Sequence, residues 1–136
     1  AIIGILAAVA IPKFADLINK SKEGATKGSL GALRSTISVY YGDSEGLYPQ
    51  DDLTCLTTNA KYIAEIPAAK IPKANDGGTT LNVGHPDSTN TTVTEELAAS
   101  DAGGWSYNST SSDNGWGTLV VNCTHQDSKQ ALWSEY

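Results

Sequence analysis

The chain has 136 residues, of which 40% are hydrophobic, and its formal net charge is −6. This length fits one domain with a modest core. Residues 13–34 carry five cationic and two acidic side chains, a net charge of +3, whereas the remainder carries four lysines and thirteen acidic residues, a net charge of −9. Such an acidic surface makes nucleic acid a poor candidate partner, but copies of the chain could associate through their oppositely charged parts.

The N-terminal segment AIIGILAAVAIPKF contains no charged residue before Lys13. As a helix, residues 1–12 would span about 18 Å, whereas the hydrocarbon core of a membrane is about 30 Å thick. A few more apolar turns upstream would complete a span. The chain contains no methionine and no basic stretch before the apolar run. We therefore expect that this N-terminus arises from processing or truncation and that the segment begins further upstream.

Beyond the apolar segment, hydrophobic residues recur at steps of three and four, which predicts an amphipathic helix that ends at Gly42, before Tyr48 and Pro49. Together with the apolar segment it would form one helix of about 40 residues. A domain this small can bury only one half of such a helix, so the other half should meet a membrane or a partner. The predicted stripe comprises Phe14, Leu17, Ile18, Leu30, Leu33, Ile37, Tyr40 and Tyr41.

Two features should weaken this helix. Pro12 lacks a backbone N–H and its ring clashes with the carbonyl four residues earlier, so it should break or kink the helix, and Gly4 weakens the same stretch. The helicity of residues 4–12 is therefore conditional. Gly24, Gly28 and Gly31 allow two interpretations. Either they make a weak, bendable helix, at about 1 kcal/mol each relative to alanine, or Gly24 and Gly28 let a neighbouring backbone come close.

The chain after residue 50 has mixed patterns. Residues 57–66 predict a short helix, capped by Thr57 or Thr58 and stopped before Pro67. Residues 67–95 are loop-rich, with a strand near 80–83, and residues 94–100 predict a helical turn. An antiparallel hairpin is predicted from 105–108 and 117–123, and a candidate last strand from 131–136. The predicted fold class is α+β, with the C-terminal half of the long helix lying on a small antiparallel sheet.

Cys55 and Cys123 are the two cysteines of the chain. In a secreted protein they would form a disulfide, which in the chain-entropy model stabilises by about 4 kcal/mol for a loop of this length. The alternative is two unrelated buried thiols. Neither cysteine has a cluster of histidines near it in the sequence, so the pattern does not favour zinc.

No pattern typical of an enzyme or of a cofactor site stands out. His85 and His125 are isolated in polar stretches, and no nucleophile motif is present. The turn SSDNG at 111–115 offers oxygen ligands for calcium, but with a single carboxylate this candidate has thin support. Serine- and threonine-rich stretches are candidates for O-linked sugars, at Ser109, Thr110, Ser111 and Thr91.

The order of an apolar segment, Ile11-Pro12 and a long amphipathic helix resembles the N-terminus of type IV pilins and pseudopilins. The blocks ALRSTISVYYGDSEGLYP, KYIAEIP and GGWSYN resemble the major pseudopilins of type II secretion systems. In this family a leader peptide is removed, the new N-terminal residue is methylated, and a nearby glutamate helps docking. The present chain starts after both of those positions. The resemblance implies a stalk at 1–23 and a globular head at 24–136 that includes the second half of the helix.

The resemblance also implies a non-enzymatic subunit that polymerises through its N-terminal helix into an extracellular filament. Its expected partners are further copies of itself, the cytoplasmic membrane before assembly, and the pilus assembly machinery. Alternatives are a periplasmic pseudopilus subunit and a membrane-anchored binding module with an aromatic-lined pocket. The segment bounded by Gly4 and Pro12 would lose helical form on assembly. The implied filament-core residues are Ile2, Ile3, Gly4, Ile5, Leu6, Ala8, Val9, Ile11, Pro12 and Phe14.

Overall fold

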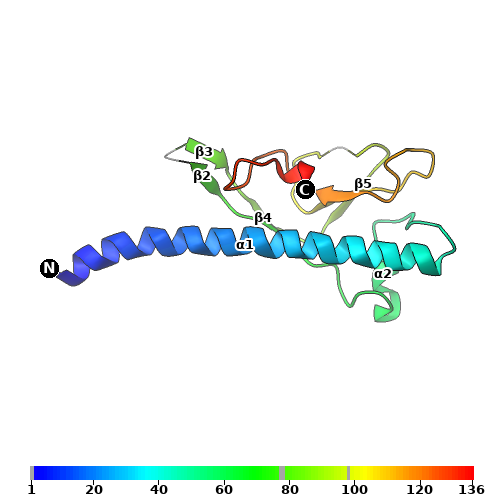
Figure 1. The fold of residues 1–136 in the computed structure, drawn as a ribbon, viewed down its shortest axis with the longest axis horizontal. Helices are drawn as coiled ribbons and strands as arrows, with labels where there is room; N and C mark the ends of the chain where they lie inside the picture. Colours follow the sequence, from blue (N-terminus) through cyan, green and yellow to red (C-terminus); the bar gives the residue numbers. More distant parts are fainter. Residues whose placement is uncertain (1, 77–78, 98) are drawn as a thin grey trace.

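The computed structural model describes residues 2–76, 79–97 and 99–136. One long helix, α1 (Ile2–Asp43), runs the length of the molecule, and the small β-sheets lie along one side of it, beyond its N-terminal end (Figure 1). The predicted α+β class is confirmed. After α1 come, in chain order, α2 (Thr54–Thr57), η1 (Thr58–Ala60), β1 (Ala69–Ile71), β2 (Ala74–Asp76), β3 (Thr79–Asn82), β4 (His85–Ser88), β5 (Thr91–Thr94), β6 (Trp105–Asn108), β7 (Leu119–Val121) and η2 (Trp133–Glu135).

The strands form three small sheets. β1 pairs with β4 and β2 with β3, both antiparallel. The third sheet has the order β5-β6-β7, with β6 and β7 antiparallel, as predicted for the hairpin, and β5 parallel to β6. The loop-rich prediction for 67–95 therefore missed several short strands, although the predicted strand near 80–83 is present as β3. Strands of three or four residues leave little periodicity for a sequence pattern to reveal.

The sequence predicts that Pro12 breaks or kinks the helix. The helix α1 is continuous through Pro12, so a break is wrong for this chain on its own, and a kink stays a prediction. Proline removes one hydrogen bond within the helix, a cost of about 3 kcal/mol. Three alanines and a leucine stand among the ten residues before it, and the amphipathic stretch follows it, so the helix propagates on both sides. The helix ends one residue beyond Gly42.

Three further predicted elements differ from the structure. The helix expected at 57–66 is replaced by α2 and η1, which begin earlier because the Asp51 carboxylate accepts hydrogen bonds from the N–H groups of Leu53 at 3.0 Å and Cys55 at 2.8 Å. In the predicted turn at 94–100, Thr94 belongs to β5 and residues 95–97 are not helical, while residue 98 lies outside the described residues. The predicted last strand is the 3₁₀ turn η2, preceded by an isolated bridge between Gln126 and Leu132.

A stripe of buried residues on α1 covers one side of the core of the head. Its five fully covered positions follow steps of three and four and pack on β1, α2 and β7. The core continues into Trp105, Tyr107 and Trp133, all with no exposed surface. The sequence identified the three hydrophobic members of the stripe but missed its two polar members at the N-terminal end. The stripe consists of Glu23, Thr26, Leu30, Leu33 and Ile37.

The two polar members of the stripe are satisfied by the backbone and side chains of the head. Thr26 Oγ1 donates to the Lys70 carbonyl at 2.6 Å and accepts from the Lys70 N–H at 2.8 Å. It therefore pairs both backbone groups of one residue of β1, as a residue of an adjacent strand does. The Glu23 carboxylate accepts from the N–H of Ser128 at 2.9 Å and from its hydroxyl at 2.6 Å. Buried polar groups that are fully paired fix one register of packing.

Asp127 ties the C-terminal segment to α1. Its fully buried carboxylate contacts the Lys27 ammonium at 2.6 Å and accepts from the Tyr136 hydroxyl at 2.6 Å. The N–H groups of Lys129 and Ala131 donate to its other oxygen at 2.8 and 3.0 Å. Burial alone would raise the pKa of Asp127, but these hydrogen bonds outweigh it and hold the pKa at about 2.

We expect Asp127→Asn to lower the free energy of unfolding by about 2–3 kcal/mol near neutral pH. The folded pKa of about 2 lies below the ordinary value near 3.9, so this stabilisation is present above about pH 4 and is lost as the pH falls toward 2. Urea unfolding followed by circular dichroism at several pH values measures it. The matched control is Asp87→Asn, at an exposed position of β4. A difference between the two variants that stays constant down to pH 2 would contradict this assignment.

Candidate functional site

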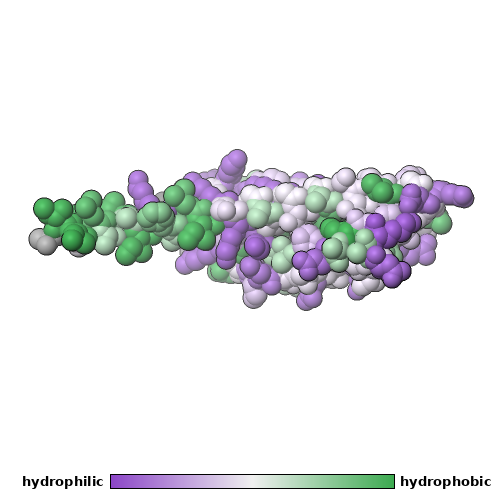
Figure 2. Space-filling view, turned by 90° about the horizontal axis from the view of Figure 1, so that it is seen from below, coloured by the Kyte–Doolittle hydropathy of each residue, from purple (hydrophilic) through white to green (hydrophobic). Residues whose placement is uncertain are grey.

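The N-terminal part of α1 projects beyond the head as an apolar rod (Figure 2). Nine large hydrophobic side chains between Ile2 and Ile18 are 57–83% exposed. By length and composition alone, α1 is long and apolar enough to cross a membrane. The structure thus places the residues predicted for the filament core together on this rod, all of them on the surface and away from the head, including Gly4, Ala8 and Pro12.

Charged residues divide the rod into faces after Lys13. At 100° per residue, Lys13, Asp16 and Lys20 share one side of α1, whereas Phe14, Leu17 and Ile18 lie on the side turned away from the buried stripe. The apolar surface therefore continues past the first charge, on the side of α1 opposite the head.

A stripe of small residues continues this outward face along the head; we call it the outward stripe. All of its members are exposed, and a Cβ added at any of its glycines would meet no atom within 4 Å. Within the described part of one chain, then, no neighbouring element approaches these glycines. The outward stripe comprises Ser21, Gly24, Ala25, Gly28, Gly31, Ala32 and Ser35.

Two of the five cationic side chains of residues 13–34 are engaged inside the subunit. Lys27 binds Asp127 and lies 3.9 Å from the ring centre of Tyr136. The Arg34 guanidinium donates to the Leu119 carbonyl, at 2.6 Å from one nitrogen, and to the carbonyl of Tyr136. The positive charge of residues 13–34 that is available for contact with another copy is therefore smaller than the five cationic residues suggest. It comes mainly from Lys13, Lys20 and Lys22.

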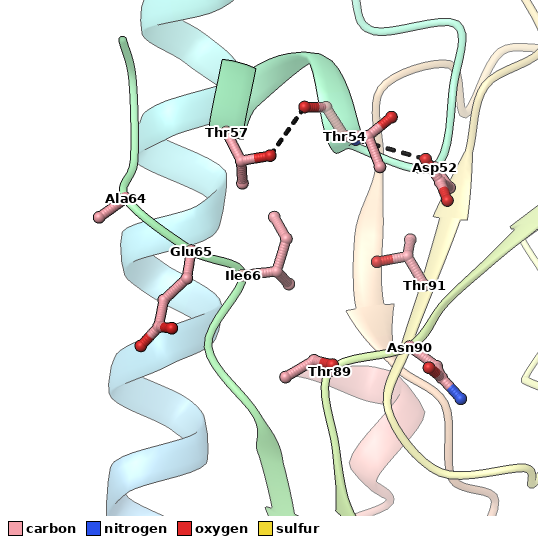
Figure 3. Close-up of a pocket in the computed structure, with 9 residues that line it drawn as sticks. All are labelled: Asp52, Thr54, Thr57, Ala64, Glu65, Ile66, Thr89, Asn90 and Thr91. Carbon is pink, nitrogen blue, oxygen red and sulfur yellow. Dashed lines mark hydrogen bonds between the residues drawn. The ribbon is translucent and has the colours of Figure 1, made fainter. Parts of the chain in front are cut away.

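The head has an open hollow of about 530 Å³ between the α2 segment and the loop before β5 (Figure 3). Ile66 and Thr91 point toward its middle, whereas Glu65 points away. The lining contains no aromatic side chain, so this hollow lacks the stacking surface that the binding-module alternative requires. It is lined by Asp52, Thr54, Thr57, Ala64, Glu65, Ile66, Thr89, Asn90 and Thr91.

The predicted disulfide is not formed. Cys55 and Cys123 are both free thiols, and they lie in different surroundings. Cys55 lies in α2, where burial and the neighbouring Asp51 carboxylate raise its pKa to about 11. Burial likewise raises the pKa of Cys123 to about 11, and its sulfur lies 3.6 Å from His125 Nδ1. The structure thus agrees with the alternative of two unrelated buried thiols.

His85 and His125, predicted to be isolated, lie side by side with ring centres 5.6 Å apart. Asp101 Oδ1 is 3.3 Å from His85 Nε2 and 3.1 Å from His125 Nδ1. Burial alone would raise the pKa of Asp101, but the N–H of Thr124 and the two histidines hold it below its ordinary value. The sequence signal that could have indicated this cluster is the short spacing of Cys123 and His125 in NCTH.

The loop between β6 and β7 carries three of the candidate sugar sites, with Ser111 exposed and Ser109 and Thr110 half-buried. The fourth, Thr91, has a buried hydroxyl oxygen, so a sugar there would have to displace its neighbours. In the same loop the Asp113 carboxylate accepts from the N–H of Gly115 at 2.9 Å and from the side chain of Asn108. Both bonds go to Oδ2 and stabilise the turn, and calcium binding at this turn stays a prediction.

The long helix, its exposed apolar end and the small sheets along the rest of it define a pilin-like α+β fold. The fimbrial protein EcpC of Eikenella corrodens is 35% identical to this chain over 69 residues, which are 48% of the chain and 44% of EcpC. The match thus spans less than half of the length of that relative. No protein-family model matches the chain, and no solved structure matches it significantly. The chain is therefore similar to a fimbrial protein along about half of its length.

Because both cysteines are free, we expect two thiols per chain in protein that is purified and denatured without reductant. Both have raised pKa values, so in the folded protein at neutral pH they should react with iodoacetamide far more slowly than a free cysteine. Mass spectrometry after alkylation counts the modified sites. A chain that gains no label after denaturation, but two after reduction, would show that the disulfide forms.

Proposed function

We propose that this chain is a non-enzymatic structural subunit that polymerises through the N-terminal part of α1 into an extracellular type IV pilus-like filament. The observation that carries the proposal is the rod of nine large hydrophobic side chains that no part of the described head covers. Full burial of such a side chain stabilises by about 1.5–3 kcal/mol. The rod therefore requires either lipid or other copies of itself around it.

The outward stripe supports a helix-to-helix assembly. Small side chains let two helices approach closely, and here they follow directly on the apolar face of Phe14, Leu17 and Ile18. The bulky rod of one copy can pack along the small-residue surface of the next. The similarity to a fimbrial protein supports the same conclusion.

Before assembly the rod is held in the cytoplasmic membrane with the head outside, and the pilus assembly machinery transfers it from lipid to the filament. On this transfer, residues 4–12 lose helical form. Pro12 already leaves one carbonyl of α1 without an intrahelical donor, and Gly4 is a weak helix former. Backbone groups freed by unwinding are tolerated where neighbouring copies, rather than lipid, surround them.

Cryo-electron microscopy of material sheared from cells that make the full-length protein tests the proposal. Long fibres with residues 1–40 at their centre are expected, and the density would show whether residues 4–12 are helical. A protein that stays with the membrane and forms only short periplasmic filaments would be a pseudopilus subunit. A monomer in detergent with no filament of any length would favour an anchored binding module.

Val9→Asp should abolish fibre formation, because a charge would be buried in the packed core of the filament. Val83→Asp is the matched control, since Val83 is 69% exposed on the head, compared with 59% for Val9 on the rod. Both variants are assayed for sheared fibres and for thermal unfolding of the head, which neither should change. Fibres at the normal level from Val9→Asp would contradict the assignment of the rod.

Two substitutions at Gly28 separate the two interpretations of the glycines. Both Gly28→Ala and Gly28→Leu should stabilise the isolated subunit by up to about 1 kcal/mol, because the position is open and the helix is continuous there. If close helix packing on the outward stripe builds the filament, alanine should permit fibres and leucine should prevent them. Fibres from both variants would leave the glycines as helix-weakening residues only.

A further inference from the structure

We propose that the head binds a zinc ion through His85, Asp101, Cys123 and His125. Each of the four side chains offers one ligand atom, and these atoms all lie within 4.8 Å of one another. The proposal concerns a site on the head and is independent of how the subunit polymerises.

The spacing of the four ligand atoms fits a tetrahedral ion. Bonds of about 2.0–2.3 Å place the ligands of tetrahedral zinc about 3.3–3.8 Å apart. His85 Nε2 and Asp101 Oδ1 are 3.3 Å apart, Asp101 Oδ1 and His125 Nδ1 are 3.1 Å apart, and His125 Nδ1 and Cys123 Sγ are 3.6 Å apart. A contraction of about 1 Å across the widest pair completes the tetrahedron.

The chemistry of the donors favours zinc over the cations that prefer oxygen. Two imidazole nitrogens, a thiolate and a carboxylate form a set that suits a borderline-soft ion, whereas calcium and magnesium take oxygen ligands almost exclusively. His85 Nε2 is buried and makes no well-aligned hydrogen bond, although Asp101 Oδ1 lies 3.3 Å away. A buried nitrogen without a well-aligned hydrogen bond is unfavourable, and a metal ion at the centre of the cluster would satisfy it.

The backbone around the site holds the ligands in place. His85 begins β4, Asp101 precedes β6, and Cys123 and His125 follow β7, so three separate segments of the chain meet at this site. A Cβ added at Gly103 would lie 3.2 Å from His85 Cβ, so the loop that carries Asp101 packs directly on His85 because a glycine stands there.

Outer hydrogen bonds orient two of the ligands in the way that is typical of metal sites. The N–H of Thr124 donates to Asp101 Oδ1 at 3.0 Å, and the N–H of His125 donates to Cys123 Sγ at 3.4 Å. Cys123 is fully buried, whereas the side chains of Asp101 and His125 are 33% and 31% exposed. The site therefore has a closed floor and an open side through which an ion can enter.

The test uses the full chain in mild detergent with a non-thiol reductant and cobalt(II) as a spectroscopic substitute for zinc. One cobalt ion per chain should bind, with intense visible bands of tetrahedral cobalt and a near-ultraviolet thiolate-to-cobalt band. Cys123→Ser should lose the thiolate band, and the matched control Cys55→Ser should keep it. His85→Gln and His125→Gln should each weaken zinc binding tenfold or more by competition with a chelator.

A measurement on the unmodified chain keeps the test independent of variants that fail to fold. Zinc at a hundredfold excess over its dissociation constant should raise the melting temperature of the head by about 5–10 °C. The proposal is overturned if the unmodified chain binds no stoichiometric cobalt or zinc. It is equally overturned if the thiolate band depends on Cys55, or if the two histidine variants bind zinc as tightly as the parent.

Discussion

The packing of α1 against the head is the constraint on which the rest of the structure depends. The stripe from Glu23 to Ile37 supplies the wall of the core, and its polar end bonds to β1 and to the C-terminal segment. The apolar side chains between Ile2 and Ile18 stay exposed, so they are available for lipid or for other copies.

The polar contacts of α1 make the helix and the head one mechanical unit. Lys27 and Asp127 pair at the junction, Arg34 binds the carbonyl of Leu119, and Thr26 bonds to the backbone of β1. Hydrogen bonds between groups of opposite charge that are shielded from solvent are stronger than exposed ion pairs. A load on a filament built from such rods would thus reach the head through buried contacts rather than through a flexible hinge.

The C-terminal segment is held at two places. Asp127 binds it to α1 near its middle, and the cluster of Cys123 and His125 with His85 and Asp101 lies at its start. A zinc ion in that cluster would link the segment to β4 and to the loop before β6, as a disulfide does in small secreted domains. The free Cys55, in α2, takes no part in this link.

The sequence alone determined the features that depend on neighbours three or four residues apart or on alternation along a strand. These are the long helix, its inward Leu30, Leu33 and Ile37, the apolar rod, and the hairpin of β6 and β7. Only the tertiary structure decided the burial of Glu23, the separation of the two cysteines, and the meeting of His85 with His125. Those outcomes depend on contacts between residues tens of positions apart, and local periodicity carries no information about them.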